Sequence, residues 1–218
     1  MRLIPETQMS KVLVVYYSEF GYVAIVAHAI AEGARSAGAV VDIKRVPETV
    51  PITTSNGAYF NPVHDDPFAA IEDLPNYDAI IVGSPTRFGR LSSPVAGFLE
   101  QASELASLDV LSGKVGGAFA SPTSVSGGHE STSMSIITNL LHFGMIVVGP
   151  PYCATAFADE AGQRHPNALD LEGARQQGRR IAQTADRLIA QTAEKISDQG
   201  KSGAASVIRG PRLAVVRR

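Results

Sequence analysis

The sequence predicts one α/β domain over residues 1–196, in which helices cover both faces of a parallel sheet. Five short apolar runs alternate with longer segments of helical periodicity, which is the pattern of successive strand–helix–strand units. Several of these runs are apolar at consecutive positions, as in strands buried on both faces. The chain has 218 residues, 44% hydrophobic and 18% charged, which is enough for one sizeable core.

Each predicted strand is an apolar run rich in β-branched residues and bounded by polar residues, Gly or Pro. The first, KVLVVYY, and the third, DAIIVGS, are apolar nearly throughout, whereas the second, AVVDIKRV, becomes polar toward its end. A long irregular connection rich in Pro, Asn and Thr occupies residues 47–76. In chain order, the strands cover residues 11–17, 39–46, 78–84, 114–121 and 145–149.

The predicted helices lie between these strands and after the last one. The first helix places Val23, Val26 and Ala27 at three- and four-residue spacings and stops before Gly38. The last begins at a plausible capping residue, Asp170. The helices cover residues 22–37, 94–105, 129–144 and 170–196. Residues 197–218 are rich in Gly, Ser, Ala and basic side chains, which predicts a flexible basic tail.

Five strands joined by right-handed crossovers favour the order 2-1-3-4-5, a flavodoxin-like doubly wound sheet. Ligands of such sheets bind beyond the carboxyl ends of the strands. The loops that follow the first, third and fourth strands are therefore the place to look for a site.

Composition excludes several classes of function. The net charge of −2 gives no electrostatic basis for nucleic-acid binding, and no apolar run reaches the length of a membrane span. The N-terminus lacks the apolar region of a signal peptide. Cys153 is the single cysteine, so an internal disulfide is impossible, and we expect a cytoplasmic protein. Histidines spaced for a metal site are absent, and no metal is predicted.

The first of these loops, SEFGYV at residues 18–23, joins the first strand directly to a helix. Free N–H groups and the positive end of the dipole at a helix N-terminus bind phosphate. Gly21 allows close approach of the backbone, and Ser18 adds a hydroxyl. A monophosphate can be held this way without Lys or Arg, although an ordinary strand-to-helix turn has the same sequence character. The P-loop and dinucleotide-binding glycine motifs are absent.

Two further loops follow neighbouring strands at the same edge: SPTRFGRLSSP at 84–94 and SPTSVSGGHES at 121–131. Each offers glycine, hydroxyls and backbone amides. One phosphate turn flanked by two such loops suits a flat, hydrogen-bonding ring attached to a phosphate, which describes FMN.

Five segments together resemble the WrbA-type NAD(P)H:quinone oxidoreductases of the flavodoxin-like tryptophan-repressor-binding-protein family. They are KVLVVYYSEFGYV, IKRVPETVP, YDAIIVGSPTRFG, SGGHES and LLHFGMIVVG, and the resemblance runs from about Lys11 to Leu188. It implies bound FMN, NAD(P)H as donor, a quinone as acceptor and a homo-oligomer, either dimer or tetramer. It implies two-electron hydride transfer through the flavin N5.

The resemblance also implies which residues hold FMN. The phosphate turn comprises Ser18, Glu19, Phe20, Gly21, Tyr22 and Val23. The ring is lined by Pro85, Thr86, Arg87, Phe88 and Gly89 on one side. On the other side it is lined by Ser121, Pro122, Thr123, Ser124, Val125, Ser126, Gly127 and Gly128, whose amides at 126–128 could stabilise negative charge on the reduced ring.

His142 and Tyr152 match family positions near the open face of the flavin, His142 as a flavin contact or proton donor and Tyr152 as a wall of the acceptor pocket. A histidine satisfied by the last turn of its helix and an ordinary half-buried tyrosine are the alternatives. Phe20 takes the family's tyrosine position beside the nicotinamide. Arg87 either orients the ring or caps a surface.

Three departures from the family pattern bear on the acceptor pocket and the tetramer. The chain has no Trp, the third loop contains Pro122 and one extra residue, and the segment after Tyr152 is short. A flavin-binding interaction module therefore stays open as an alternative. A one-electron flavodoxin carrier is the other alternative. Phe20 and Val23 stand where carriers have threonines, and the acidic balance is modest, which favours the oxidoreductase.

Overall fold

The computed structural model describes residues 9–48, 65–122, 124, 126–149, 154–156 and 165–207, with side chains through Ile196. Its centre is a sheet of five parallel strands in the order β2-β1-β3-β5-β6. Numbered along the chain, these are the five predicted strands in the predicted order 2-1-3-4-5, which confirms the fold class. The strands are β1 (Lys11–Tyr16), β2 (Val40–Arg45), β3 (Ala79–Arg87), β5 (Val115–Ser121) and β6 (Ile146–Val147).

Two short strands were not predicted. β4 (Arg90–Leu91) pairs antiparallel with the end of β3, and β7 (Ala154–Thr155) pairs parallel with β5. The predicted fifth strand over 145–149 is correspondingly shorter, because only two of its residues pair with β5. Both additions lie at the C-terminal halves of central strands, so they extend the edge at which the loops gather.

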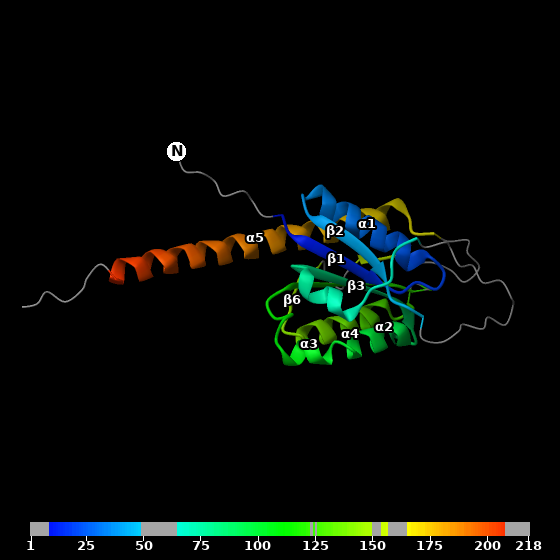
Figure 1. Cartoon of the computed structure of the whole chain (residues 1–218). Coiled ribbons are helices and arrows are strands. Elements are labelled where there is room, and N and C mark those ends of the chain that lie inside the picture. Colours follow the sequence, from blue (N-terminus) through cyan, green and yellow to red (C-terminus); the bar gives the residue numbers. More distant parts are fainter. Residues whose placement is uncertain are drawn as a thin grey trace, which may run out of the picture.

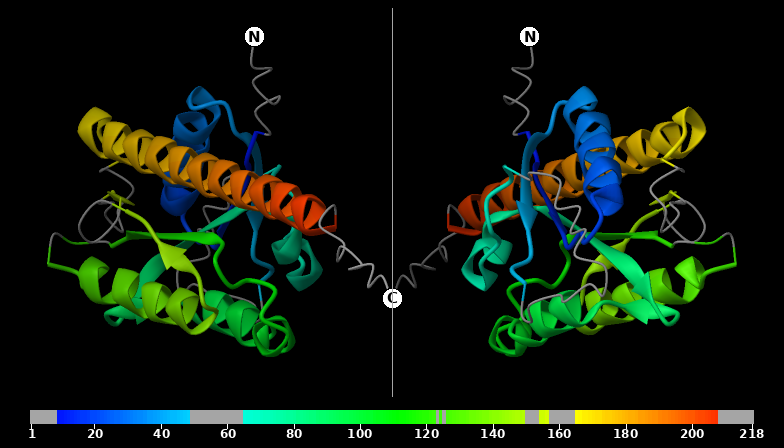
Figure 2. Two further views of the ribbon diagram at one scale, coloured as in Figure 1. Left: turned by 90° about the vertical axis from the view of Figure 1, so that its left-hand side faces the viewer. Right: turned by 90° about the vertical axis from the view of Figure 1, so that its right-hand side faces the viewer.

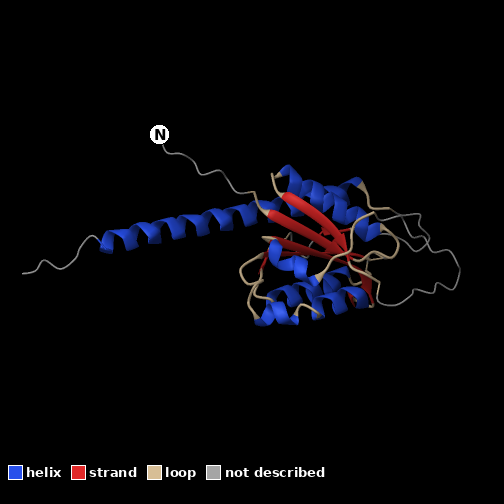
Figure 3. Cartoon of the chain, in the orientation of Figure 1, coloured by secondary structure: helices blue, strands red, loops and turns tan. Residues whose placement is uncertain are grey.

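Helices cover both faces of the sheet (Figures 1 and 3). α1 (Tyr22–Ser36) and α5 (Ala168–Val207) pack on one face, where Val14, Phe119 and Ile181 belong to one buried cluster. The other face carries α2 (Ser93–Glu100), α3 (Ser103–Ser107), α4 (His129–His142) and the 3-10 helix η1 (Ile71–Asn76). The sheet is thus buried on both sides, as its continuous apolar runs predict.

The helices differ from prediction at several places, and α4 ends at His142 rather than at residue 144 while α5 begins at Ala168 rather than at Asp170. The predicted helix 94–105 is divided into α2 and α3, and η1 lies within the connection predicted to be irregular. The predicted end of the last helix at residue 196 is wrong, because α5 continues to Val207 (Figure 2). Residues 208–218 of the predicted tail lie outside the described part. No helix in the described part of the chain has the length and apolarity to cross a membrane.

Candidate functional site

The three predicted loops meet beyond the carboxyl ends of β1, β3 and β5. Residues from all three line one small cavity of about 30 Å³, and the Arg87 side chain reaches across to Glu19 there. The lining residues are Ser18, Glu19, Phe20, Tyr22 and Val23 from the first loop, Pro85, Thr86 and Arg87 from the second, and Ser121 and Pro122 from the third. The expectation that these loops form one site is therefore supported by their placement.

The first loop turns sharply into α1. Gly21 occupies the N-cap position with φ 86°, in the left-handed region that side chains disfavour, and no side chain caps the helix there. The Ser18 hydroxyl accepts a long hydrogen bond of 3.4 Å from the amide of Ala24. The remaining amides of the first turn have no carbonyl four residues earlier within the helix, so this end of α1 has the geometry of an anion site.

The second loop is the hairpin between β3 and β4. Thr86 pairs with Leu91 and Arg87 with Arg90, leaving Phe88 and Gly89 as a two-residue turn. Both turn residues have positive φ, 52° and 75°, as a type I′ turn requires. The Phe88 side chain is 100% exposed. An aromatic residue held in this conformation without burial has no structural benefit in a single chain.

Two serines that the sequence analysis did not single out fix this hairpin. The Ser84 hydroxyl accepts a hydrogen bond from the Ser92 amide at 2.8 Å and donates to the Pro85 carbonyl at 2.9 Å. Both serines are buried. Their spacing on either side of the RFG turn is the signal that could have identified them, since small polar residues flanking a tight turn often bond across it.

The third loop lies against the second. A Cβ at Gly128, where φ is 83°, would lie 2.8 Å from the Gly89 Cα, so the two backbones are in contact. The Gly127 amide donates to the Ser124 carbonyl at 3.0 Å. This amide is therefore already bonded within the loop, whereas the sequence predicts that it is free to stabilise negative charge on the reduced ring. The Ser121 hydroxyl donates to the Ala156 carbonyl. Thr123 and Val125 lie outside the described residues.

One polar group in the site points to a ligand. The Thr86 hydroxyl is buried in the cavity wall and has no hydrogen-bond partner among the described residues. Buried hydroxyls are nearly always satisfied. Together with the left-handed glycine at the start of α1, this unsatisfied hydroxyl supplies the kinds of group that the phosphate and the hydrogen-bonding ring of FMN would need.

The structure does not bring His142 to this cluster. His142 is the last residue of the 14-residue α4, whose first residue, His129, follows the third loop. A helix of that length is about 20 Å long, so His142 lies near the amino edge of the sheet. The chain enters β6 four residues later, opposite the first residue of β5. His142 is exposed there, and Tyr152 lies outside the described residues.

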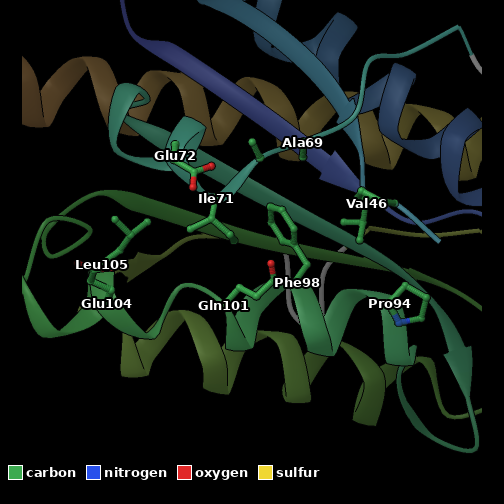
Figure 4. Close-up of a pocket in the computed structure, with 11 residues that line it drawn as sticks. Val46, Ala69, Ile71, Glu72, Pro94, Phe98, Gln101, Glu104 and Leu105 are labelled. Atoms are coloured by element: carbon green, nitrogen blue, oxygen red, sulfur yellow. The ribbon is translucent and has the colours of Figure 1, made fainter. Parts of the chain in front are cut away.

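A larger groove of about 560 Å³ lies elsewhere (Figure 4). It is bounded by the end of β2, the start of η1 and one side of α2 and α3, and its lining includes Ile71, Phe98, Glu72 and Glu104. Apart from Pro94, the last residue of the second loop, none of the described residues of the three loops lines it. Among the described residues, no cluster of His, Cys, Asp and Glu could hold a metal ion.

Comparisons with known proteins agree with this geometry. Residues 10–160 match the family model described as NADPH-dependent FMN reductase. A "NAD(P)H dehydrogenase (quinone)" of Cupriavidus metallidurans is 53% identical over 83% of this chain and 100% of its own length. One of the same name from Acidovorax ebreus is 52% identical over 83% of this chain and 99% of its own.

A solved structure shows the same fold. The "flavodoxin, WrbA-like protein" of Agrobacterium tumefaciens superposes with a TM-score of 0.64 and 25% identity, covering 82% of this chain and 98% of that one. The relatives confirm the resemblance carried by the sequence motifs. The chain therefore belongs to the NADPH-dependent FMN reductase family, and within it to the WrbA-type NAD(P)H dehydrogenases (quinone).

Proposed function

We propose that this chain is an FMN-dependent NAD(P)H dehydrogenase that reduces quinones. One observation carries the proposal: three loops converge at the carboxyl edge of the sheet around an unsatisfied Thr86 hydroxyl, in a chain that is more than half identical to proteins of that name. When bound, FMN supplies two-electron chemistry, accepting hydride from a nicotinamide and passing it to a quinone.

The chain's own residues bind and orient the cofactor. The turn from Ser18 to Val23 holds the phosphate through the amides at the start of α1. The Thr86 hydroxyl donates to a polar edge of the ring, and the backbone contact of Gly89 with Gly128 keeps the second and third loops at a fixed separation. The N-terminus of α4 directs its dipole toward the site, which favours the anionic reduced ring.

Phe20 is half-buried beside this turn and is our candidate for the wall against which the nicotinamide packs. Tyr152 stays a prediction for the acceptor pocket. We assign His142 no contact with the cofactor of its own chain, because α4 separates it from the loops. The single cysteine fits a reducing compartment, so we propose a cytoplasmic location.

Exposed apolar side chains along α4 and on the β3–β4 hairpin favour self-association. Met134 and Leu141 lie seven residues apart on one side of α4, and both are exposed. Phe88 is exposed on the hairpin that contacts the start of that helix. Exposed apolar side chains along one side of a helix support an interface there. We propose that this face of α4 joins copies of the chain in a dimer or tetramer.

An anaerobic reduction experiment tests the activity. The FMN-loaded protein is mixed with NADH or NADPH, and the flavin absorbance near its visible maximum is followed before and after addition of benzoquinone. Rapid bleaching by either nucleotide, followed by recovery with the quinone, is the expected result. A flavin that neither nucleotide bleaches would leave a flavin-binding interaction module, and a semiquinone that accumulates during titration would indicate a one-electron carrier.

A further inference from the structure

An ion pair joins the phosphate turn to the ring-lining hairpin. The Arg87 guanidinium on β3 contacts the carboxylate of Glu19 on the first loop, through Nη2 and Oε2. Both residues were predicted to hold FMN, but their pairing was not foreseen. Both line the small cavity where the three loops meet. The pair therefore lies in the site rather than on a remote surface.

The two charges differ in their access to water. The Glu19 side chain is only 5% exposed, whereas that of Arg87 is 44% exposed. Among the described side chains, Arg87 is the one that forms an ion pair with the Glu19 carboxylate. Burial of an ionised carboxylate is tolerated only when a partner neutralises it. Arg87 thus offsets the free-energy cost of burying the negative charge of Glu19.

The position of Glu19 is unfavourable for an anionic ligand. It lies between Ser18 and Gly21, in the turn whose amides would hold a phosphate. A bound phosphate monoester carries close to two negative charges at neutral pH. Repulsion between this phosphate and an uncompensated carboxylate would be strong, because the Glu19 side chain is buried, where the effective dielectric constant is lower than in water.

We propose that Arg87 supports FMN binding chiefly by neutralising Glu19, and that Glu19 is the residue that makes Arg87 necessary. This inference rests on the proposed function, because it concerns the same cofactor site. It gives Arg87 a positioning and compensating role, in place of the direct grip on the ring that its location first indicates. Its distinctive consequence is that loss of Arg87 is harmful only while residue 19 carries a negative charge.

A double-mutant cycle on FMN affinity tests the proposal. Quenching of FMN fluorescence gives the dissociation constant for the wild type, Arg87→Met, Glu19→Gln and the double variant. We expect Arg87→Met to weaken binding by about tenfold or more, because it leaves the buried carboxylate unpaired. Glu19→Gln and the double variant should both bind within about threefold of the wild type, because neither retains that unpaired charge.

Two controls separate this explanation from simpler ones. Arg90→Met removes the same charge from an exposed position of the same hairpin and should change the affinity by less than about twofold, because exposed charges are screened. Thermal unfolding without FMN measures how much the Glu19–Arg87 pair contributes to stability. Arg87→Met should lower the Tm by about 5 °C, and the double variant should recover most of this loss.

The outcomes are distinct. If the double variant binds FMN as weakly as Arg87→Met does, Arg87 holds the cofactor itself. That result would overturn the inference while the proposed function stands. Additive changes in Tm would show that the two side chains are not coupled, with the same consequence. A wild-type protein that does not bind FMN would overturn the proposed function and the cofactor role of the pair together. If Arg87→Met does not fold, rescue of folding by Glu19→Gln supports the inference and failure of rescue opposes it.

Discussion

The backbones of Gly33 on α1 and Arg175 on α5 are in direct contact. A Cβ at Gly33 would lie 1.9 Å from the Arg175 carbonyl oxygen, and a Cβ at Gly178 would lie 1.9 Å from the Ile30 carbonyl oxygen. Each helix therefore presents a glycine to the other's backbone, which lets the two pack closely over the sheet. This contact holds α1, and with it the turn from Ser18 to Val23, against α5, the longest of the described helices.

Substitution of either glycine tests this packing. Gly33→Ala or Gly178→Ala should destabilise the protein by about 3 kcal/mol, because the helices must separate to admit the methyl group. Urea unfolding measures the change. The matched control is Gly173→Ala on α5, where an added Cβ meets nothing within 4 Å. That variant should be neutral or slightly more stable, since Ala favours helix by about 1 kcal/mol over Gly. Equal effects at positions 33 and 173 would contradict the close contact.

We expect Phe88 to lower the stability of the protein while contributing to its function. Its φ of 52° is unfavourable for an aromatic residue, and its exposed side chain contributes no burial. Phe88→Asn should raise the stability by about 1 kcal/mol, because Asn-Gly is the preferred type I′ sequence. The same variant should weaken FMN binding or self-association, measured by fluorescence and by sedimentation. A variant that gains stability and loses neither property would show that Phe88 has no role at the site.

The contact between Gly89 and Gly128 makes the site sensitive to one methyl group. Gly128→Ala introduces a Cβ 2.8 Å from the Gly89 Cα at a position with positive φ. The second and third loops should move apart, and we expect FMN affinity to fall by about tenfold with a loss of about 2 kcal/mol in stability. Gly97→Ala on α2, which meets nothing within 4 Å, is the control and should retain the wild-type affinity.

Two buried tyrosines predict loss of stability at alkaline pH. Burial, followed by the hydrogen bond to Asp66 and the charge of Asp66, raises the pKa of Tyr16, with a smaller opposing effect of Arg45. Burial and the bond to Asp42 likewise raise the pKa of Tyr77. A raised folded pKa preserves full stability below the unfolded value of about 10 and removes it as the pH rises further.

The slope of that loss is the measurement. Each tyrosine that stays protonated in the folded protein should steepen the fall of unfolding free energy by about 1.4 kcal/mol per pH unit above pH 10. Tyr77→Phe should reduce the slope of unfolding free energy against pH by the contribution of one tyrosine. Urea unfolding between pH 9 and 11 measures this slope. Identical slopes for the variant and the wild type would show that Tyr77 ionises as readily when folded as when unfolded.

The sequence predicted the elements that depend on local pattern. The apolar runs around Val14 and Ile81 indicated buried parallel strands, and the strand order followed from the alternation with helices. The meeting of the three loops followed in turn, because the carboxyl ends of parallel strands share an edge. Gly21 could also be identified from the sequence, because a glycine between a strand and the first helix indicates that the backbone can approach a ligand closely.

Features that depend on tertiary placement were not predictable in this way. The β3–β4 hairpin has a turn of Phe88 and Gly89, and Phe is not a residue that signals a two-residue turn. The extension of α5 to Val207 passes through Gly- and Ser-rich sequence that favours coil. The pairing of Glu19 with Arg87 joins residues 68 positions apart, so opposite charge alone could not identify it. The distance of His142 from the loops follows from the direction of α4 rather than from its motif.

The binding of FMN by the isolated protein tests the central claim most directly. The purified chain is saturated with FMN, passed through gel filtration, and its flavin absorbance is compared with its protein concentration. We predict about one FMN retained per chain, because the three loops of the described part of the chain form one such site. A protein fraction that emerges colourless, with all FMN in the small-molecule volume, would contradict the account.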